Sequence, residues 1–420
     1  MFNKFWGSIA VFDQPFVDSL TSGAVDALPD DVLTEMEQAG FLVPADLDEI
    51  DTAHGLYVSR RAKNSVLNIT MELTQECNLA CTFCYQNSYR GEGAITSVGI
   101  DNVVGYIDTV LTERKRPITD VVFRLIGGEP LMQKAKVLEA VERGKELTAR
   151  HGVQFHPQID TNGLLLDESV VKALRSISIT ITNKADHDKV RVRHNGAGSY
   201  DQIVNRLRRH AQHFNEYGTI LSIRFNANAL NAKYVPDVYR MTKELGIGRA
   251  EFELYNTVNY SYNLLTPGLS RTQFKRLYME LLALKVEHGE IITDFPRPTF
   301  TPCSAYTPYN VKFAADGKLA ACDAMHTARG SADDLIADVD RHGEIFADVA
   351  AHDPFEHPQC GKCPNVGICG GMLFCKTNPH VADNDPCDFL PFDLDEFLRF
   401  FVRQYPVTPD GFDLGPALVE

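Results

Sequence analysis

The sequence predicts an α/β fold in which parallel strands alternate with helices, followed by a cysteine-rich region. Three observations lead to this prediction. Six short apolar or alternating runs within residues 66–254 have the length and composition of strands, and helical patterns separate them. Glycine-rich and polar motifs follow several of these runs directly. The ten cysteines form two groups, at residues 77–84 and 303–387, with none between them.

The repeating unit is a strand followed by a helix. The expected strands lie at 66–73, 121–126, 154–160, 177–182, 220–226 and 250–254. The expected helices lie at about 97–113, 132–150, 167–175, 200–216, 232–245 and 270–288. This alternation implies parallel pairing through right-handed crossovers. Because such barrels place their sites at the carboxyl ends of the strands, the motifs found there are the candidate site residues.

Residues 1–62 form an acidic segment ahead of the first strand. Pro29 followed by Asp30 and Asp31 predicts a helix start, because carboxylates are favoured at a helix N-terminus. Residues 32–40 then read as a short helix closed by glycine. No catalytic chemistry is evident in this segment.

Composition excludes several classes of protein. The chain has 420 residues, 44% of them hydrophobic and 23% charged, as expected for a globular protein larger than one small domain. Its net charge is −15 and it has no basic run, which argues against a nucleic-acid partner. No signal-peptide pattern or membrane-spanning apolar run is present, so we expect a cytoplasmic protein with no membrane partner.

Three thiols, Cys77, Cys81 and Cys84, lie within eight residues directly after the first expected strand. Three thiolates on one loop can hold three corners of a 4Fe–4S cluster, which leaves one iron free to bind a cofactor or substrate. The alternatives are a zinc knuckle or three buried thiols. Zinc needs a fourth ligand, and no Cys or His follows within the next sixty residues.

The C-x3-C-x2-C spacing, with aromatic Phe83 before its last cysteine, resembles the radical S-adenosylmethionine (SAM) enzymes. In that family the free iron chelates the amino and carboxylate groups of SAM. The reduced cluster cleaves SAM to a 5′-deoxyadenosyl radical, which abstracts hydrogen from an unactivated carbon. The resemblance implies a partial, six-stranded (β/α)6 version of the TIM barrel at residues 63–290.

Two motifs after the second and third strands also match this family. Gly127-Gly128-Glu129 would hold the amino group of SAM, because glycines allow close backbone approach and a carboxylate accepts hydrogen bonds from an ammonium. The alternative is a common turn. Residues 161–163 (Thr-Asn-Gly) end the third strand as in this family, where the motif lines the site.

The fourth and fifth strands end in less typical motifs. Relatives place Ser-hydrophobic-Asp-Gly after the fourth strand, whereas this chain has Thr180 and then Thr182-Asn183. The resemblance puts the Thr180 hydroxyl and the Arg191 guanidinium near the SAM carboxylate, and the lost Asp-Gly removes a carboxylate from the site wall. Arg224 in the fifth strand would bind the SAM carboxylate or pair with an acid of the barrel.

The second cysteine group resembles the SPASM signature of seven cysteines, which carries two auxiliary 4Fe–4S clusters and implies a SPASM domain at 291–390. One departure is that five residues, not three, separate the last two cysteines before position 387. The resemblance assigns the inner cluster to Cys303, Cys322 and Cys375, and the outer cluster to Cys360, Cys363, Cys369 and Cys387. The inner cluster then has an open iron or a non-cysteine ligand. Two structural zinc ions are the alternative.

Two smaller features belong to the same region. Asp316-Gly317 predicts a hairpin between residues 310–315 and 318–322. Asp323 directly follows Cys322, and in anaerobic sulfatase-maturating relatives an Asp at this place is a general base. A structural role is the alternative. Residues 391–420 are expected to be a C-terminal helix and tail.

The predicted function is that of a radical SAM/SPASM peptide maturase. It would abstract hydrogen from a residue of a ribosomally synthesised precursor peptide and oxidise the product radical through the auxiliary clusters, forming a crosslink or similar modification. Residues 1–62 then either recognise the peptide or cap the barrel. The alternatives are a dehydrogenase or sulfur-inserting enzyme acting on a small molecule, a formylglycine-forming sulfatase maturase, and a non-enzymatic electron carrier. An electron donor such as flavodoxin or ferredoxin is implied.

Overall fold

The computed structural model describes most of the chain. The described residues are 1–24, 28–84, 86, 93–113, 116–257, 268–293, 295–300, 303–322, 329–370, 390–405, 407–408 and 411–412.

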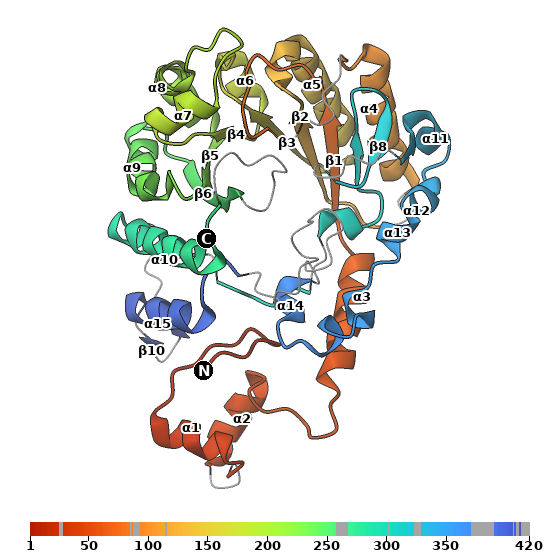
Figure 1. Cartoon of the computed structure of the whole chain (residues 1–420). Helices are drawn as coiled ribbons and strands as arrows, with labels where there is room; N and C mark the ends of the chain where they lie inside the picture. Colours follow the sequence, from red (N-terminus) through yellow and green to blue (C-terminus); the bar gives the residue numbers. More distant parts are fainter. Residues whose placement is uncertain are drawn as a thin grey trace.

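Six parallel strands form the centre of the molecule and confirm the predicted α/β barrel. They pair in the order β6-β5-β4-β3-β2-β1. Their bounds are Val66–Glu72 (β1), Asp120–Ile126 (β2), Gln154–Thr161 (β3), Ser176–Thr180 (β4), Ile220–Ala227 (β5) and Ala250–Asn256 (β6). Among the described strands β6 pairs only with β5, so the barrel is partial and is not closed (Figure 1).

Helices cover the outer face of this sheet, as the alternation predicts (Figure 1). The expected ones are Ser97–Glu113 (α4), Lys134–His151 (α5), Glu168–Ala173 (α6), Tyr200–Tyr217 (α8), Val235–Glu244 (α9) and Arg271–Glu287 (α10). A further helix, α7 (Lys184–Val190), was not predicted. It is short and almost wholly polar, so it has no apolar stripe for sequence reasoning to find.

The two faces of the sheet differ in chemistry. In β2, Val121, Phe123 and Leu125 are fully buried in the core beneath the helices. Arg124 points to the other face and is half-buried. The register places Thr70 of β1 and Gln158 of β3 beside Arg124. The barrel interior is therefore lined by polar side chains, unlike the packed apolar interior of a complete TIM barrel.

Three strands of the cysteine-rich part extend the same sheet. They are Val311–Phe313 (β7), Lys318–Ala320 (β8) and Arg329–Ser331 (β9). The predicted hairpin at Asp316-Gly317 is confirmed, with Gly317 at φ 80°. Strand β7 pairs in parallel with β1 and so joins the barrel, which was not predicted. One buried ion pair crosses this junction, with Lys312 Nζ 4.0 Å from Glu72 Oε1.

The N-terminal part consists of α1 (Gln14–Thr21), α2 (Asp30–Gln38) and α3 (Glu49–Ala62). Helix α2 confirms the predicted short helix. Helix α3 was not predicted, and the Asp48 carboxylate caps it by accepting from two backbone N–H groups. Its buried residues, Ala53 and Tyr57, pack with Phe300, so this helix docks on the cysteine-rich part as well as leading into β1.

The remaining C-terminal elements are short, apart from one helix. They are η6 (Ser304–Tyr306), α11 (Ala332–Ala337), α12 (Arg341–Ile345), α13 (Ala347–Ala350), η7 (Pro354–Glu356), η8 (Cys360–Lys362), α14 (Val366–Cys369), α15 (Leu394–Gln404), β10 (Val407–Thr408) and β11 (Gly411–Phe412). The predicted C-terminal helix is α15, which packs beside α10 through Phe392 and Phe397 (Figure 1).

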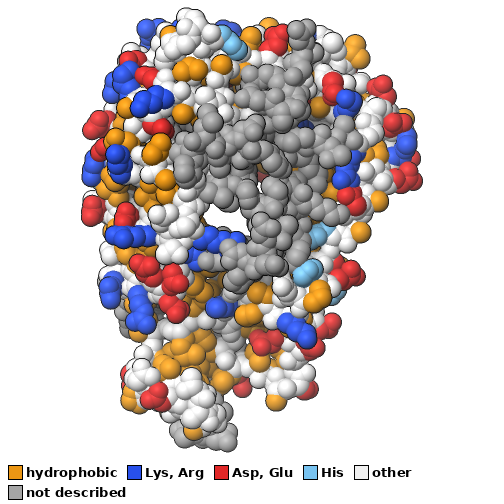
Figure 2. Space-filling model, in the orientation of Figure 1, with side chains coloured by type: hydrophobic (Ala, Val, Ile, Leu, Met, Phe, Trp, Pro, Cys, Tyr) orange, Lys and Arg blue, Asp and Glu red, His pale blue; other side chains and the backbone are white. Residues whose placement is uncertain are grey.

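Two properties of the whole chain bear on its partners. Within the described residues, no helix is both long enough and apolar enough to span a bilayer. On the face shown in Figure 2, Lys and Arg are interspersed with Asp and Glu rather than gathered into one patch.

Candidate active site at the carboxyl edge of the sheet

The loop that carries the first three cysteines is held by the end of β2. The N–H of Gly128 donates to the carbonyl of Thr74 at 2.7 Å, and the N–H of Glu129 donates to the carbonyl of Glu76 at 2.8 Å. A Cβ on Gly128 would lie only 2.2 Å from the Glu76 oxygen, and one on Gly127 would lie 2.6 Å from the Thr74 oxygen. The two glycines are therefore needed to bring this backbone against the segment leading into Cys77.

The other side of the loop is held by the segment after α7. The N–H of Ala80 donates to the carbonyl of Val192 at 2.7 Å, and His194 Nε2 donates to the carbonyl of Cys77 at 2.8 Å. Leu79 is fully buried in the core and anchors the middle of the loop. Cys77, Cys81 and Cys84, in contrast, are each partly exposed. Three thiols have the donor chemistry that an iron–sulfur cluster needs, but among the described residues no three such side chains are grouped closely enough to hold a metal.

Glu129 is fully buried between the ends of β2 and β3. Its carboxylate accepts hydrogen bonds from Thr161 Oγ1 (2.6 Å), the Asn162 N–H (2.7 Å) and the Leu131 N–H (3.0 Å). Burial raises the pKa of Glu129, and these hydrogen bonds oppose that rise. The carboxylate thus links the ends of β2 and β3 through hydrogen bonds. Its contact with the amino group of SAM stays a prediction.

Asn162 connects the end of β3, where Glu129 is bound, to the cysteine loop. Its Nδ2 donates to Asn78 Oδ1 at 2.7 Å and lies 4.0 Å from Cys77 Sγ. The Thr-Asn-Gly motif was predicted to line the site, and here its asparagine lies directly against the loop.

The His-Asp pair that precedes Arg191 has a structural role. Burial, reinforced by Arg191, lowers the pKa of His187 to about 3, so its imidazole is neutral. Its Nδ1 accepts from the Thr182 N–H at 3.4 Å, and its Nε2 lies 3.1 Å from Ser199 Oγ. Asp188 Oδ1 accepts from the backbone N–H groups of residues 199 and 200. These contacts order the segment that flanks the cysteine loop.

Buried polar atoms without partners lie at the end of β4. Within the described residues, Thr182 Oγ1, Asn183 Oδ1 and Arg191 Nε are buried and make no hydrogen bond. Such atoms are rare in folded proteins unless a ligand, ion or water satisfies them. Their position beside the cysteine loop therefore fits a polar ligand. From the sequence, the Thr182-Asn183 pair stood out only because it replaces an Asp-Gly and so removes a carboxylate from the site. Thr180 is half-buried and lies opposite Arg224 in the register of β4 and β5.

A row of alternating charges crosses the polar face of the sheet. Arg124 pairs with Asp160, Arg224 Nη1 lies 2.9 Å from Asp160 Oδ2, and Arg224 Nε lies 3.2 Å from Glu253 Oε2. Of the two predicted roles for Arg224, the structure contains the ion pair with barrel acids. Arg124, Asp160 and Glu253 were not among the predicted site residues. The sign of their role in the sequence was a charge at an inward position of β2, β3 and β6.

Three thiols of the cysteine-rich part, at Cys360, Cys363 and Cys369, lie in one short stretch of the chain. Cys360 and Cys369 are buried and Cys363 is partly exposed. Burial, followed by the charges of Cys369 and Cys363, raises the pKa of Cys360 to about 11, as expected for neighbouring thiols away from water. Across the described ranges, no three His, Cys, Asp or Glu side chains are grouped so as to hold a metal ion. Three predicted site residues, Asp323, Cys375 and Cys387, lie outside the described residues.

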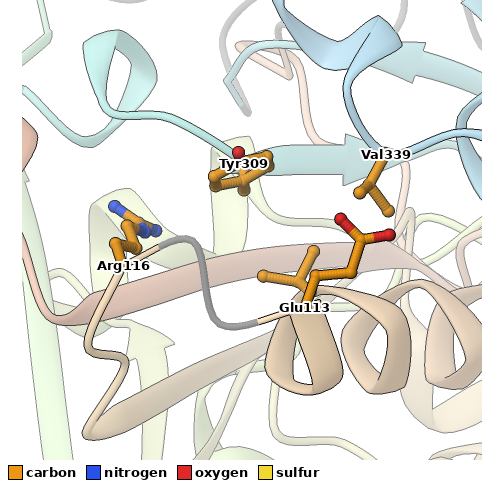
Figure 3. A pocket seen from close by; sticks show the side chains of 5 residues that line it. Glu113, Arg116, Tyr309 and Val339 are labelled. Carbon is orange, nitrogen blue, oxygen red and sulfur yellow. The ribbon is translucent and has the colours of Figure 1, made fainter.

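A small pocket lies at the opposite, amino-terminal edge of the sheet (Figure 3). Arg116 and Tyr309 line one side, and Glu113 and Val339 line the other. The Arg116 guanidinium lies over the Tyr309 ring, 5.6 Å from its centroid. Its cavity volume is about 10 Å³, roughly enough for a single water molecule. We therefore assign it to the packing of α4 against the cysteine-rich part, not to the reaction.

The strands and the cysteine loop described above lie in a segment that matches a radical SAM domain. Residues 71–226 match the radical SAM superfamily, and this segment spans the cysteine loop and β1 to β5. This family implies SAM and a 4Fe–4S cluster as cofactors.

Similarity extends well beyond this segment. The chain is 28% identical over 366 residues to the cysteine-type anaerobic sulfatase-maturating enzyme of Clostridium perfringens (strain 13 / Type A), covering 79% of this chain and 94% of the relative. It shares the fold of native anSMEcpe with bound AdoMet and Kp18Cys peptide (19% identity, TM-score 0.57, 81% and 96% coverage). It also shares the fold of Streptococcus suis SuiB bound to precursor peptide SuiA (15% identity, TM-score 0.53, 90% and 93% coverage).

Proposed function

We propose that this radical SAM enzyme is a peptide maturase that modifies a residue of a ribosomally synthesised precursor. The observation that carries this proposal is the arrangement at the carboxyl edge of the sheet. A three-thiol loop held on both sides faces the polar interior of an open barrel, next to buried polar atoms that have no partner within the described residues. When bound, the cluster and SAM supply the homolytic chemistry that removes hydrogen from carbon.

The protein's own residues would bind and orient this cofactor. Cys77, Cys81 and Cys84 would hold the cluster. The Thr180 hydroxyl, the unpaired Arg191 Nε and the oxygen atoms of Thr182 and Asn183 would bind the polar groups of SAM. The Gly127-Gly128-Glu129 segment would fix the loop, and its Glu129 would hold the SAM amino group. Arg224, already paired with two acids, would contribute to the wall of the barrel.

The cysteine-rich part would hold two auxiliary 4Fe–4S clusters. Their ligands would be Cys303, Cys322 and Cys375 for one cluster, and Cys360, Cys363, Cys369 and Cys387 for the other. These clusters would accept the electron that the product radical loses, and Asp323 would accept the accompanying proton. A reduced flavodoxin or ferredoxin would supply electrons.

Two features support a peptide substrate. Solved structures with this fold were obtained with bound peptides, and the match to SuiB spans 90% of this chain. The charged row on the polar face of the barrel alternates guanidinium and carboxylate groups, which suits the polar groups of a peptide. Residues 1–62 are a candidate element for recognising the precursor.

A formylglycine-forming sulfatase maturase is the second candidate. The observation that favours it is the 28% identity to the cysteine-type enzyme over most of both chains. The Thr182-Asn183 replacement and the extended N-terminal part favour the first candidate. A dehydrogenase or sulfur-inserting enzyme for a small molecule is the remaining alternative.

One experiment separates these candidates. The full chain is incubated without oxygen with reductant and SAM, and with either a short peptide encoded next to its gene or a cysteine-containing sulfatase peptide. We expect the neighbouring peptide to lose the mass of two hydrogens, whereas the sulfatase peptide stays unchanged. The Cys77→Ala/Cys81→Ala/Cys84→Ala variant is the control and should modify neither. SAM consumption with no mass change in either peptide would overturn the peptide proposal.

A further inference from the structure

Arg116, in the connection between α4 and β2, carries a positive charge into the interior of the protein. The residue is 6% exposed, and within the described part of the chain its Nε and Nη1 atoms are buried and make no hydrogen bond. Its Nη2 makes a long hydrogen bond, to the carbonyl of Val66 at 3.4 Å. Because arginine is almost never buried unless it is paired, we expect an acceptor with negative charge beside these nitrogen atoms.

The guanidinium borders the small pocket at the amino-terminal edge of the sheet (Figure 3). The cavity volume of about 10 Å³ leaves room for one particle of about the size of a water molecule. A water molecule would accept hydrogen bonds from Arg116 but would leave its charge uncompensated. A halide ion is only slightly larger than water, and it would both accept the hydrogen bonds and neutralise the charge.

The residue that covers the guanidinium is held in an unusual conformation. Tyr309 has φ 66°, in the left-handed region that residues other than glycine rarely adopt. Its ring lies 5.6 Å from the Arg116 guanidinium, and its carbonyl accepts from Tyr106 Oη at 2.8 Å. Strained residues persist where their surroundings fix them, and they gather at ligand sites. The pocket wall next to Arg116 is therefore fixed in place.

The charged groups near Arg116 leave its positive charge in place. Burial lowers the pKa of Arg116 to about 10, and the groups that oppose this shift are Tyr106 and then Tyr309, not carboxylates. The guanidinium therefore stays protonated at neutral pH. Glu113 lines the opposite side of the pocket and is exposed to solvent (Figure 3). In the sequence, residues 114–115 are also basic, which adds positive charge to this connection.

We propose that the pocket beside Arg116 binds a single small anion such as chloride, which neutralises the guanidinium. This inference goes beyond the proposed function and does not depend on it. Val66 begins β1, and Tyr309 lies two residues before β7, the strand that pairs in parallel with β1. A ligand that binds only the folded state stabilises it. The anion would therefore stabilise the junction between the barrel and the cysteine-rich part.

The test compares bromide with gluconate, which is too large for the pocket. The full chain is purified without oxygen, and its thermal unfolding is followed while sodium bromide replaces sodium gluconate at constant ionic strength, so that charge screening stays the same. We expect a saturable rise of about 1–3 °C in the unfolding midpoint. Arg116→Met removes the charge and keeps an unbranched side chain of similar length, and this variant should not respond to bromide.

Arg276→Met is the matched control. The Arg276 side chain in α10 is 83% exposed and its Nε lies 3.1 Å from Glu280 Oε1, so this variant should respond to bromide as the unaltered chain does. If Arg116→Met does not fold, crystals of the unaltered chain grown in bromide decide, because the bound ion should give an anomalous peak beside Arg116 Nε and Nη1.

Two results would overturn this inference. The first is an equal response of the unaltered chain and Arg116→Met to bromide, which would indicate that a water molecule fills the pocket. The second is a crystal in which no bromide peak lies beside Arg116. Neither result bears on the peptide proposal, because no step of the modification reaction involves this pocket.

Discussion

Individual residues explain why the cysteine loop has a fixed position. The Gly-Gly-Glu motif was predicted to bind SAM, and its geometry shows a second reason for its composition. Its glycines contact the backbone before Cys77, and its glutamate joins the ends of β2 and β3. The sequence identified Gly127, Gly128 and Glu129 as candidate site residues. It did not indicate that they contact each other across three segments, because those contacts depend on how strand ends meet in space.

Gly128→Ala tests this explanation. The new Cβ would lie 2.2 Å from the Glu76 oxygen, so the loop must move. We expect a loss of about 1–3 kcal/mol in the free energy of unfolding and a lower iron content. Both can be measured by urea unfolding and metal analysis after anaerobic purification. Gly105→Ala is the control, because nothing lies within 4 Å of its Cβ and alanine favours helix α4. Equal effects of the two substitutions would contradict the explanation.

His187 gives a prediction about pH. Its folded pKa of about 3 lies below the unfolded value of 6.5, so between these values the unfolded chain binds a proton that the folded chain does not. Its contribution to stability is therefore complete above pH 6.5 and falls by about 1.4 kcal/mol per pH unit below it. His187→Asn keeps an acceptor for the Thr182 N–H but cannot titrate. Urea unfolding between pH 5.5 and 7.5 should show a smaller loss of stability for this variant. Parallel curves would rule out this role.

At the scale of elements, strand periodicity and helix length were enough to place the barrel. All six parallel strands and the six helices expected between and after them were predicted, because most of them have either a run of β-branched residues or an apolar stripe. Helices α1, α3 and α7 were also missed. Helix α7 is almost wholly polar, and in α3 the polar and apolar residues do not separate onto two faces, so neither has a clear apolar stripe. The union of β7 with β1 was also missed, because a three-residue strand has too little pattern to show its partner.

The buried Lys312–Glu72 pair makes this union testable. Lys312→Met should destabilise the protein by about 3–5 kcal/mol, because it leaves the Glu72 carboxylate buried and unpaired. Adding Glu72→Gln removes that charge and keeps an acceptor for the Ala315 N–H, so the double variant should recover most of the loss. Urea unfolding and limited proteolysis of the cysteine-rich part measure both effects. A double variant as unstable as the single one would show that the pair does not join the two parts.

For the whole molecule, composition and cysteine distribution predicted a barrel followed by a second metal-binding region. The fold and the radical SAM domain agree with the barrel, and the second metal-binding region stays a prediction. The charge row inside the barrel was not predicted, because each of its residues is ordinary in its own strand. Only the packing of the strands in space brings these residues into contact, and the Arg224–Asp160 pair even crosses β4, which lies between β3 and β5.

Metal content is the corresponding prediction. Three 4Fe–4S clusters require about twelve iron atoms per chain. We expect anaerobically purified protein to contain this amount and no stoichiometric zinc, measured by plasma mass spectrometry. The Cys77→Ala/Cys81→Ala/Cys84→Ala variant should keep about eight. Zinc in place of iron at either cysteine group would contradict the proposed chemistry of that group.

The pairing of β7 with β1 has one more consequence. Thr70 stands opposite Lys312, so a backbone ladder connects the strand that leads to Cys77 with β7, the strand that follows Cys303. Sliding one strand by two residues would shift its end by about 7 Å. The register of this short ladder therefore determines the distance between the loop that carries Cys77 and the segment that carries Cys303 and Cys322.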